Sequence, residues 1–339
     1  MGHPPQGNAG QGHLPQGVAA LEVWQNKNKV NLSLKDETSD TQFLLKLGNG
    51  ICWSFMATPK TRSWVQKFAT IIGLNPDDRD MSRSSTRMFF VPGRWKKDEC
   101  NEPNPLIFSK IKTDLPTDGW NGVDFGALRL WTHKGTPDIV CEIEPARSHR
   151  VDIVKMWTAL YGIYLRSFDS GGLILHGALI ERNGSGVLLA GPGGAGKSTL
   201  SRRLPPAWHV LSDDQSLVVP DDQNRYLAHP VPTWSDHLWH GSEQNWNIQH
   251  YVPLAAIFFI EQATSDRVVP IGQGQAAVRI NDSCAEAINP VWWHMDMKEK
   301  TDIKKKIFDN ASDMARTVPA HILRNSLNGY FWDEIEKVL

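Results

Sequence analysis

One eight-residue motif constrains this chain more than any other feature of its sequence. Residues 191–198 read Gly-Pro-Gly-Gly-Ala-Gly-Lys-Ser and match the pattern G-x-x-x-x-G-K-[ST]. Glycines let the backbone curl so that successive N–H groups point at an anion, and a following helix presents its positive N-terminal end to the same anion. The apolar run Val187–Ala190 precedes the motif, and a helix is expected from near Gly196. The motif therefore predicts a phosphate-binding loop between a strand and a helix, rather than an incidental glycine-rich turn.

The residue types of this loop indicate a nucleotide and a divalent cation. Lys197 would bridge the β- and γ-phosphates, and Ser198 would place its hydroxyl on Mg²⁺, which prefers oxygen ligands and keeps several waters. We therefore expect ATP and Mg²⁺ as ligands. The residues predicted to contact them are Gly191, Pro192, Gly193, Gly194, Ala195, Gly196, Lys197, Ser198 and Thr199.

Two adjacent carboxylates follow the next apolar segment. The run from Trp208 to Ser212 is typical of a short strand, and Asp213 and Asp214 come directly after it. A carboxylate at a strand end is where a phosphate-loop enzyme holds or orients its Mg²⁺, and a second one beside the metal can accept a proton. An Asp-Asp turn is the alternative. The separation from Lys197, which leaves room for one helix and one strand, favours a functional pair.

The remaining pattern predicts three segments. Residues 1–18 are rich in Gly, Pro, Gln and His and are predicted to be a disordered tail. Residues 19–148 mix short β-type runs with one helical stretch, which indicates a small α+β region. Residues 149–339 are predicted to form an α/β domain around the loop. The predicted strands and helices are Gln42–Leu47, Ile51–Met56, Ser63–Ile72 (helix), Arg87–Val91, Ala127–Trp131, Arg150–Arg166 (helix), and a hairpin of Leu173–Glu181 with Val187–Ala190.

Composition excludes several classes of protein. The chain has 36 Lys+Arg against 37 Asp+Glu, a balance that argues against a dedicated nucleic-acid binder. No apolar run approaches the roughly 20 residues needed to cross a bilayer, and no secretory signal is recognisable. The four cysteines are widely scattered, without metal-ligand or disulfide spacing. We expect a soluble cytoplasmic protein with neither nucleic-acid nor membrane partners.

Three stretches around the loop resemble a known family. They are Leu175–Glu181, Gly191–Thr199 and Ser212–Asp214, and together they are similar to the core of the HPr kinase/phosphorylase family. The resemblance implies a P-loop kinase core of the HPr kinase and phosphoenolpyruvate carboxykinase type. It also implies that Asp213 is the catalytic base, that Asp214 is a magnesium-site carboxylate, and that His176 lies near the γ-phosphate. Because HPr kinases form oligomers, a homo-oligomer is possible.

Four later stretches carry a second resemblance. They are His229–Trp234, Val252–Ala263, Gly272–Ala276 and Ser326–Trp332. They resemble a narrower subgroup, the HPr-kinase-like proteins of SynChlorMet peptide cassettes, the ScmC type. That resemblance implies a kinase that works beside ribosomally made peptides. The chain also lacks a Glu-Ile-Arg-Gly motif after the aspartates, which argues against phosphorylase activity and against HPr as the substrate.

The sequence therefore predicts Mg²⁺-dependent transfer of the ATP γ-phosphoryl group to a serine or threonine hydroxyl of a peptide or protein. Two alternatives remain open. One is a nucleotide-responsive binding module with negligible turnover, against which the paired aspartates argue. The other is a small-molecule kinase, which differs only in its acceptor.

Histidines and tryptophans gather in the segment after residue 226. His229, His237, His240 and His250 show no recognised zinc pattern, and we expect them on the surface or in a substrate groove. Trp234, Trp239 and Trp246 are consistent either with an aromatic shelf for a ligand or with core packing.

Overall fold

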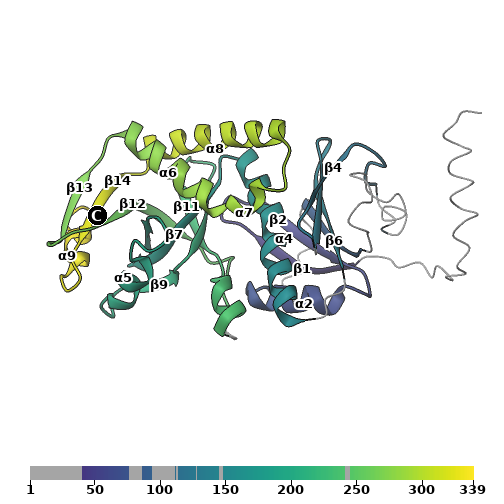
Figure 1. The fold of residues 1–339 in the computed structure, drawn as a ribbon, viewed down its shortest axis with the longest axis horizontal. Helices are drawn as coiled ribbons and strands as arrows, with labels where there is room; N and C mark the ends of the chain where they lie inside the picture. Colours follow the sequence, from purple (N-terminus) through teal and green to yellow (C-terminus); the bar gives the residue numbers. More distant parts are fainter. Residues whose placement is uncertain are drawn as a thin grey trace, which may run out of the picture. The chain divides into compact units, whose positions relative to one another are not determined.

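The computed structural model describes residues 40–75, 86–93, 111, 114–126, 128–144, 148–240 and 245–339. These residues form two β-sheets with accompanying helices, so the fold is mixed α/β (Figure 1). The tail predicted for residues 1–18 lies outside the described part of the chain. In the part that is described, no helix is both long enough and apolar enough to span a bilayer.

The first sheet has the strand order β1-β2-β3-β6-β5-β4, with parallel pairs β2–β3 and β3–β6 and otherwise antiparallel neighbours. Helix α2 makes the crossover that a parallel β2–β3 pair requires, and it buries Val65, Phe68, Ala69 and Ile71. Strands β4 and β6 were not among the predicted elements. The bounds are β1 Asp40–Lys46, β2 Cys52–Ala57, α2 Arg62–Ile71, β3 Thr86–Pro92, β4 Trp120–Asp124, β5 Leu128–His133 and β6 Thr136–Ile143.

Helix α4, His149–Asp169, connects β6 to the second sheet. It begins at Ser148, whose side chain caps the helix by accepting a hydrogen bond from the Val151 N–H. Its apolar residues are buried on a broad face, as the predicted helix over 150–166 requires. The chain leaves it through Gly171, which has a positive φ of 81°, and enters the strand that carries His176.

The second sheet has the order β11-β10-β7-β8-β12-β14-β13, and β9 also pairs with β7. Strands β8, β12 and β14 are parallel neighbours, whereas β7 and β8 form the predicted antiparallel hairpin. Its two-residue turn is Asn183-Gly184, both at positive φ, as a type I′ turn requires. The bounds are β7 Leu173–Arg182, β8 Ser185–Ala190, β9 His209–Ser212, β10 Gln215–Pro220, β11 Tyr226–Pro230, β12 Val252–Gln262, β13 Arg267–Pro270 and β14 Ala320–Asn325.

The central strand β12 is buried on both faces. Ile257 and Phe259 belong to the main hydrophobic cluster, together with Ile280 of α6. The alternate residues Ala256, Phe258 and Ile260 belong to a second cluster, which includes Leu200 of α5 and Phe331 of α9. This two-residue alternation explains why the strand reads as a continuous apolar run.

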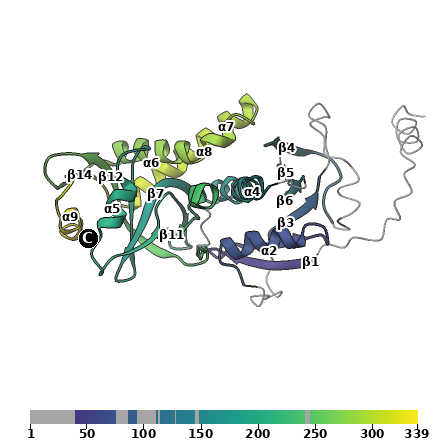
Figure 2. The same ribbon diagram turned by 60° about the horizontal axis from the view of Figure 1, so that its bottom comes forward.

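The remaining helices follow or flank the second sheet, and α6 packs along α8, as Figures 1 and 2 show. Helix α8 begins at Asp296, whose carboxylate accepts a hydrogen bond from the Glu299 N–H at 2.8 Å. The bounds are α5 Lys197–Arg203, a π-helical turn Asp236–His240, α6 Gln273–Ala287, α7 Asn289–Trp292, α8 Met297–Thr317 and α9 Phe331–Glu336.

Candidate active site

The glycine-rich loop lies between the end of β8 at Ala190 and the start of α5 at Lys197. This confirms the predicted order of strand, loop and helix. Gly194 and Gly196 have φ values of 80° and 104°, a left-handed region that disfavours any residue with a Cβ. Gly196 is also the residue that caps the N-terminus of α5. These two glycines therefore permit the curled backbone that the motif predicts.

Lys197 folds back onto the loop that precedes it. Its residue is 7% exposed, and its ammonium donates hydrogen bonds to the carbonyl oxygens of Gly191 at 2.6 Å and Pro192 at 3.2 Å. Burial lowers the pKa of Lys197, against the opposing influence of Glu286 and Asp214. The positive charge is therefore held at the loop, close to the position where the motif predicts phosphate.

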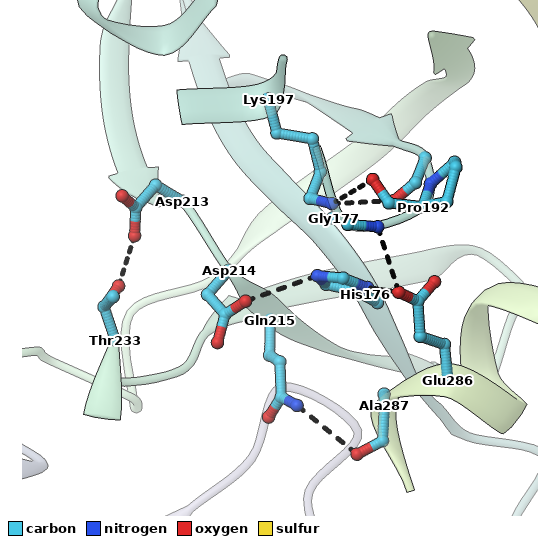
Figure 3. A network of polar contacts seen from close by, with 12 residues as sticks. His176, Gly177, Pro192, Lys197, Asp213, Asp214, Gln215, Thr233, Glu286 and Ala287 are labelled. Atoms are coloured by element: carbon cyan, nitrogen blue, oxygen red, sulfur yellow. Dashed lines mark hydrogen bonds and ion pairs between the residues drawn. The ribbon is translucent and has the colours of Figure 1, made fainter. Parts of the chain in front are cut away.

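The two adjacent aspartates lie in the bend between β9 and β10 and have different partners (Figure 3). Asp213 accepts a hydrogen bond from the hydroxyl of Thr233. Asp214 lies with its Oδ1 atom 3.4 Å from Nε2 of His176, and its side chain is 40% exposed. The bend thus separates the two carboxylates, and only Asp214 contacts His176.

His176 lies on β7 between two carboxylates, as Figure 3 shows. Its Nδ1 atom is 2.9 Å from Oε1 of Glu286, and its Nε2 atom faces Asp214. Burial opposes the charged imidazolium, but the contacts with Asp214 and Glu286 outweigh it and raise the pKa of His176 above its ordinary value. The positive charge of Lys197 also opposes protonation, so the raised pKa is the net result of these opposing influences.

Glu286 is the residue that sequence reasoning missed. It lies near the C-terminal end of α6, and its Oε1 atom also accepts a hydrogen bond from the Gly193 N–H at 3.1 Å. One of the loop N–H groups that the motif assigns to phosphate therefore donates its hydrogen bond to a carboxylate instead. No local pattern marks Glu286, because helix α5, five strands, the π-helical turn and most of α6 separate it from the loop.

The end of α6 is anchored to the strands that carry the site. The Ala287 carbonyl accepts hydrogen bonds from Gln215 Nε2 at 3.3 Å and from the Tyr161 hydroxyl at 3.4 Å. Ser283 donates to the His176 carbonyl at 3.3 Å. These contacts hold Glu286 beside His176.

Thr233 is a second contact that the sequence did not predict. It lies within a stretch that carried the family resemblance, but no local pattern indicates its hydrogen bond to Asp213.

Ser198 and Asp214 fit a magnesium ion by the chemistry of their donors. Ser198 is exposed in the first turn of α5, and both residues offer the oxygen ligands that Mg²⁺ prefers. Two protein oxygens are enough, because Mg²⁺ usually keeps several waters. The described residues include no cluster of three or more His, Cys, Asp or Glu side chains that could hold a metal. The role of this pair as a magnesium site stays a prediction.

The expectation of surface or substrate-groove histidines is wrong for His229 and His237, which are 0% and 4% exposed. His229 Nε2 accepts a hydrogen bond from the Gly48 N–H at 3.1 Å, and Nδ1 lies 2.7 Å from the Ile248 carbonyl. His237 packs against the ring of Trp246. Long-range packing, which no local pattern reports, buries both rings.

The tryptophans of this segment divide between the core and the surface. Trp234 and Trp246 are 2% and 5% exposed, so core packing is the correct alternative for both. Trp239 is 65% exposed. The three indoles therefore do not form one aromatic shelf.

Two comparisons with known proteins bear on the family. The model of the SynChlorMet cassette protein ScmC family matches residues 139–339, more than half of the chain. The chain belongs to the ScmC family. The matched segment contains every candidate site residue from His176 to Glu286. An HPr kinase/phosphorylase from Mycoplasmopsis pulmonis is 31% identical over 92 residues, which cover 25% of this ScmC-family chain and 30% of that protein. The chain thus aligns with less than a third of that relative's length.

Proposed function

We propose that this ScmC-family protein is a kinase that transfers the γ-phosphoryl group of ATP to a serine or threonine hydroxyl of a peptide or protein. The observation that carries the proposal is the convergence of Lys197, His176 and Asp214 beside the glycine-rich loop. The similarity to an HPr kinase/phosphorylase supports it. The resemblance to peptide-cassette proteins supports a ribosomally made peptide as the acceptor.

Each residue of the loop has a binding role in this proposal. The loop N–H groups and Lys197 hold the nucleotide phosphates and offset the charge that develops on them during transfer. Ser198 and Asp214 would hold Mg²⁺, which when bound would neutralise phosphate charge. Lys197 must exchange its present carbonyl partners, Gly191 and Pro192, for phosphate oxygens.

Asp213 is the proposed general base. Its carboxylate takes the proton of the acceptor hydroxyl as the hydroxyl oxygen forms a bond to the γ-phosphorus. The bond between the γ-phosphorus and the bridging oxygen breaks, and ADP leaves with that electron pair. The Thr233 hydroxyl donates to Oδ1 of Asp213, and a carboxylate has a second oxygen that can receive the proton.

His176 is proposed to hold the transferring group in place. Its imidazole lies on β7 between Asp214 and Glu286, beside the glycine-rich loop. A hydrogen-bond donor already positioned beside developing negative charge in a partly buried site stabilises the transition state.

Mass spectrometry of the purified protein with Mg-ATP and the peptides encoded beside its gene tests the proposal. We expect the gain of one phosphate on a peptide hydroxyl and no gain with Lys197→Ala. Tight nucleotide binding without transfer to any peptide would contradict the peptide kinase. That result would favour the nucleotide-responsive binding module, and transfer to a small molecule instead would favour the third alternative.

A further inference from the structure

A groove of about 620 Å³ adjoins the candidate active site, between the end of α6, helix α7 and the start of α8. None of the roles proposed above uses this groove. The residues that give it its character are Glu286, Trp292, Trp293, Met297, Lys300 and Lys304.

The groove is apolar along one part and basic along another. Trp293 and Met297 are 80% and 76% exposed, although both are large apolar side chains. Neighbouring apolar side chains so exposed often mark an interaction surface. Lys300 and Lys304 lie one turn apart on α8, and the Lys304 ammonium lies 5.7 Å from the centre of the Trp292 ring. Lys304 therefore places positive charge beside Trp292, and both lysines line the same groove as the exposed Trp293 and Met297.

Glu286 connects this groove to the candidate active site. Its side chain lines the groove, and the same carboxylate contacts His176 and the Gly193 N–H. A chain segment lying in the groove would therefore reach the glycine-rich loop at one end.

We infer that the groove binds the acceptor, an acidic peptide segment with an aromatic or large aliphatic side chain near its serine or threonine. This inference rests on the proposed kinase function. Trp293 and Met297 offer adaptable apolar contact area to such a side chain. Lys300 and Lys304 complement Asp or Glu side chains of the peptide, which gives specificity and faster association.

An arrayed peptide library tests the inference. Every peptide carries one serine, and the flanking positions vary independently among acidic, basic, neutral and aromatic residues. Binding to the full chain is read by fluorescence anisotropy, and transfer is read separately by mass spectrometry. We expect the bound peptides to be enriched in Asp or Glu together with Phe, Trp or Leu.

Three single variants locate the binding surface. Trp293→Ala, Lys300→Glu and Lys304→Glu should each raise the KM for the preferred peptides by roughly tenfold, with kcat and nucleotide affinity unchanged. The two lysine variants should also shift the preference toward basic peptides, which a merely structural defect would not do. Lys305→Glu is the matched control, because Lys305 is exposed on the same helix but does not line the groove. It should match the wild type.

The outcomes separate this inference from the kinase proposal. The groove is not the acceptor site if the bound peptides show no preference for acidic and apolar residues, or if the preference persists in all three variants. Either result contradicts the inference even if peptides are phosphorylated. The absence of binding by any peptide also overturns it. Peptides that bind in the groove, lose binding in the variants, and never gain phosphate overturn the kinase proposal and leave the groove in place.

Discussion

Asp213 and Asp214 are neighbours in sequence, yet the bend between β9 and β10 gives them different surroundings. Asp213 contacts a neutral hydroxyl, whereas Asp214 contacts a histidine whose pKa is raised. Asp214 is held beside His176 at the glycine-rich loop, where a metal-site carboxylate is needed, whereas Thr233 holds one oxygen of Asp213 and a carboxylate has a second oxygen that can receive a proton. The division of roles proposed for the pair follows from these partners.

Asp213→Asn should therefore lower the rate of phosphoryl transfer by about 10²- to 10⁴-fold, the usual contribution of a general base. The amide oxygen can still accept the Thr233 hydrogen bond, so ATP affinity should change by no more than about twofold. Single-turnover kinetics and calorimetric titration measure the two quantities. Asp222→Asn, in an exposed turn, is the control. Transfer at the wild-type rate would show that Asp213 is not the base.

Glu286→Gln should tighten ATP binding by roughly three- to tenfold. The substitution removes a negative charge that lies against the Gly193 N–H, where it competes with and repels phosphate. It also removes one of the contacts that raise the pKa of His176, so that pKa should fall. Calorimetry and an NMR titration of the His176 imidazole give the two readouts. Weaker ATP binding in the variant would mean that Glu286 supports the nucleotide site instead.

At the scale of the element, the loop depends on glycine at the junction with α5. An added Cβ at Gly196 would meet no atom within 4 Å, so any cost of substitution comes from its φ of 104° rather than from crowding. Gly274, in the first turn of α6, also has open space and lacks a positive φ. The two positions separate backbone strain from the general effect of removing a glycine.

Gly196→Ala should destabilise the protein by about 1–2 kcal/mol, because a left-handed conformation is unfavourable for alanine. Gly274→Ala should instead stabilise it by up to about 1 kcal/mol, since alanine is the better helix former. Urea denaturation followed by circular dichroism measures both changes. Nucleotide affinity should fall only in Gly196→Ala, because strain there redirects the loop N–H groups. Equal effects of the two substitutions would argue against the strained loop.

At the scale of the whole molecule, His229 connects strands that are far apart in the sequence. Its ring contacts the backbone of Gly48, which follows β1, and of Ile248, which precedes β12. Burial lowers the pKa of His229 to about 4, and the hydrogen bond to Ile248 only partly offsets this effect. The neutral ring is therefore part of the folded state, and a proton on it opposes folding.

Between pH 6.5 and about 4, His229 is protonated in the unfolded chain but neutral in the folded protein. The free energy of unfolding should therefore be unaffected by His229 above pH 6.5, and should fall by about 3 kcal/mol as the pH drops toward 4. His229→Gln should remove this pH-dependent loss of stability, although the variant should be less stable than the wild type at pH 7. Denaturant unfolding at a series of pH values measures it, with exposed His209→Gln as the control. An unchanged pH profile in His229→Gln would contradict the assignment.

The sequence by itself determined the parts of this protein that depend on a few consecutive residues. The loop from Gly191 to Ser198 and the hairpin of Leu173–Glu181 with Val187–Ala190 were both predicted from the sequence. Each reflects a local rule of backbone conformation or side-chain alternation. The same rules place Lys197, Asp213 and Asp214 at the ends of predicted elements. The family resemblance likewise rests on short stretches of consecutive residues.

Only the tertiary structure decided which distant side chains complete the site. Glu286 reaches His176 because α6 packs on β7, and Thr233 reaches Asp213 through the chain after β11. Packing also buried His229 and left Trp293 exposed at a groove. Such contacts depend on how whole elements dock, and the docking is set by the combined burial of many apolar residues. No short stretch of sequence carries that information, whereas a glycine loop needs only its own few residues.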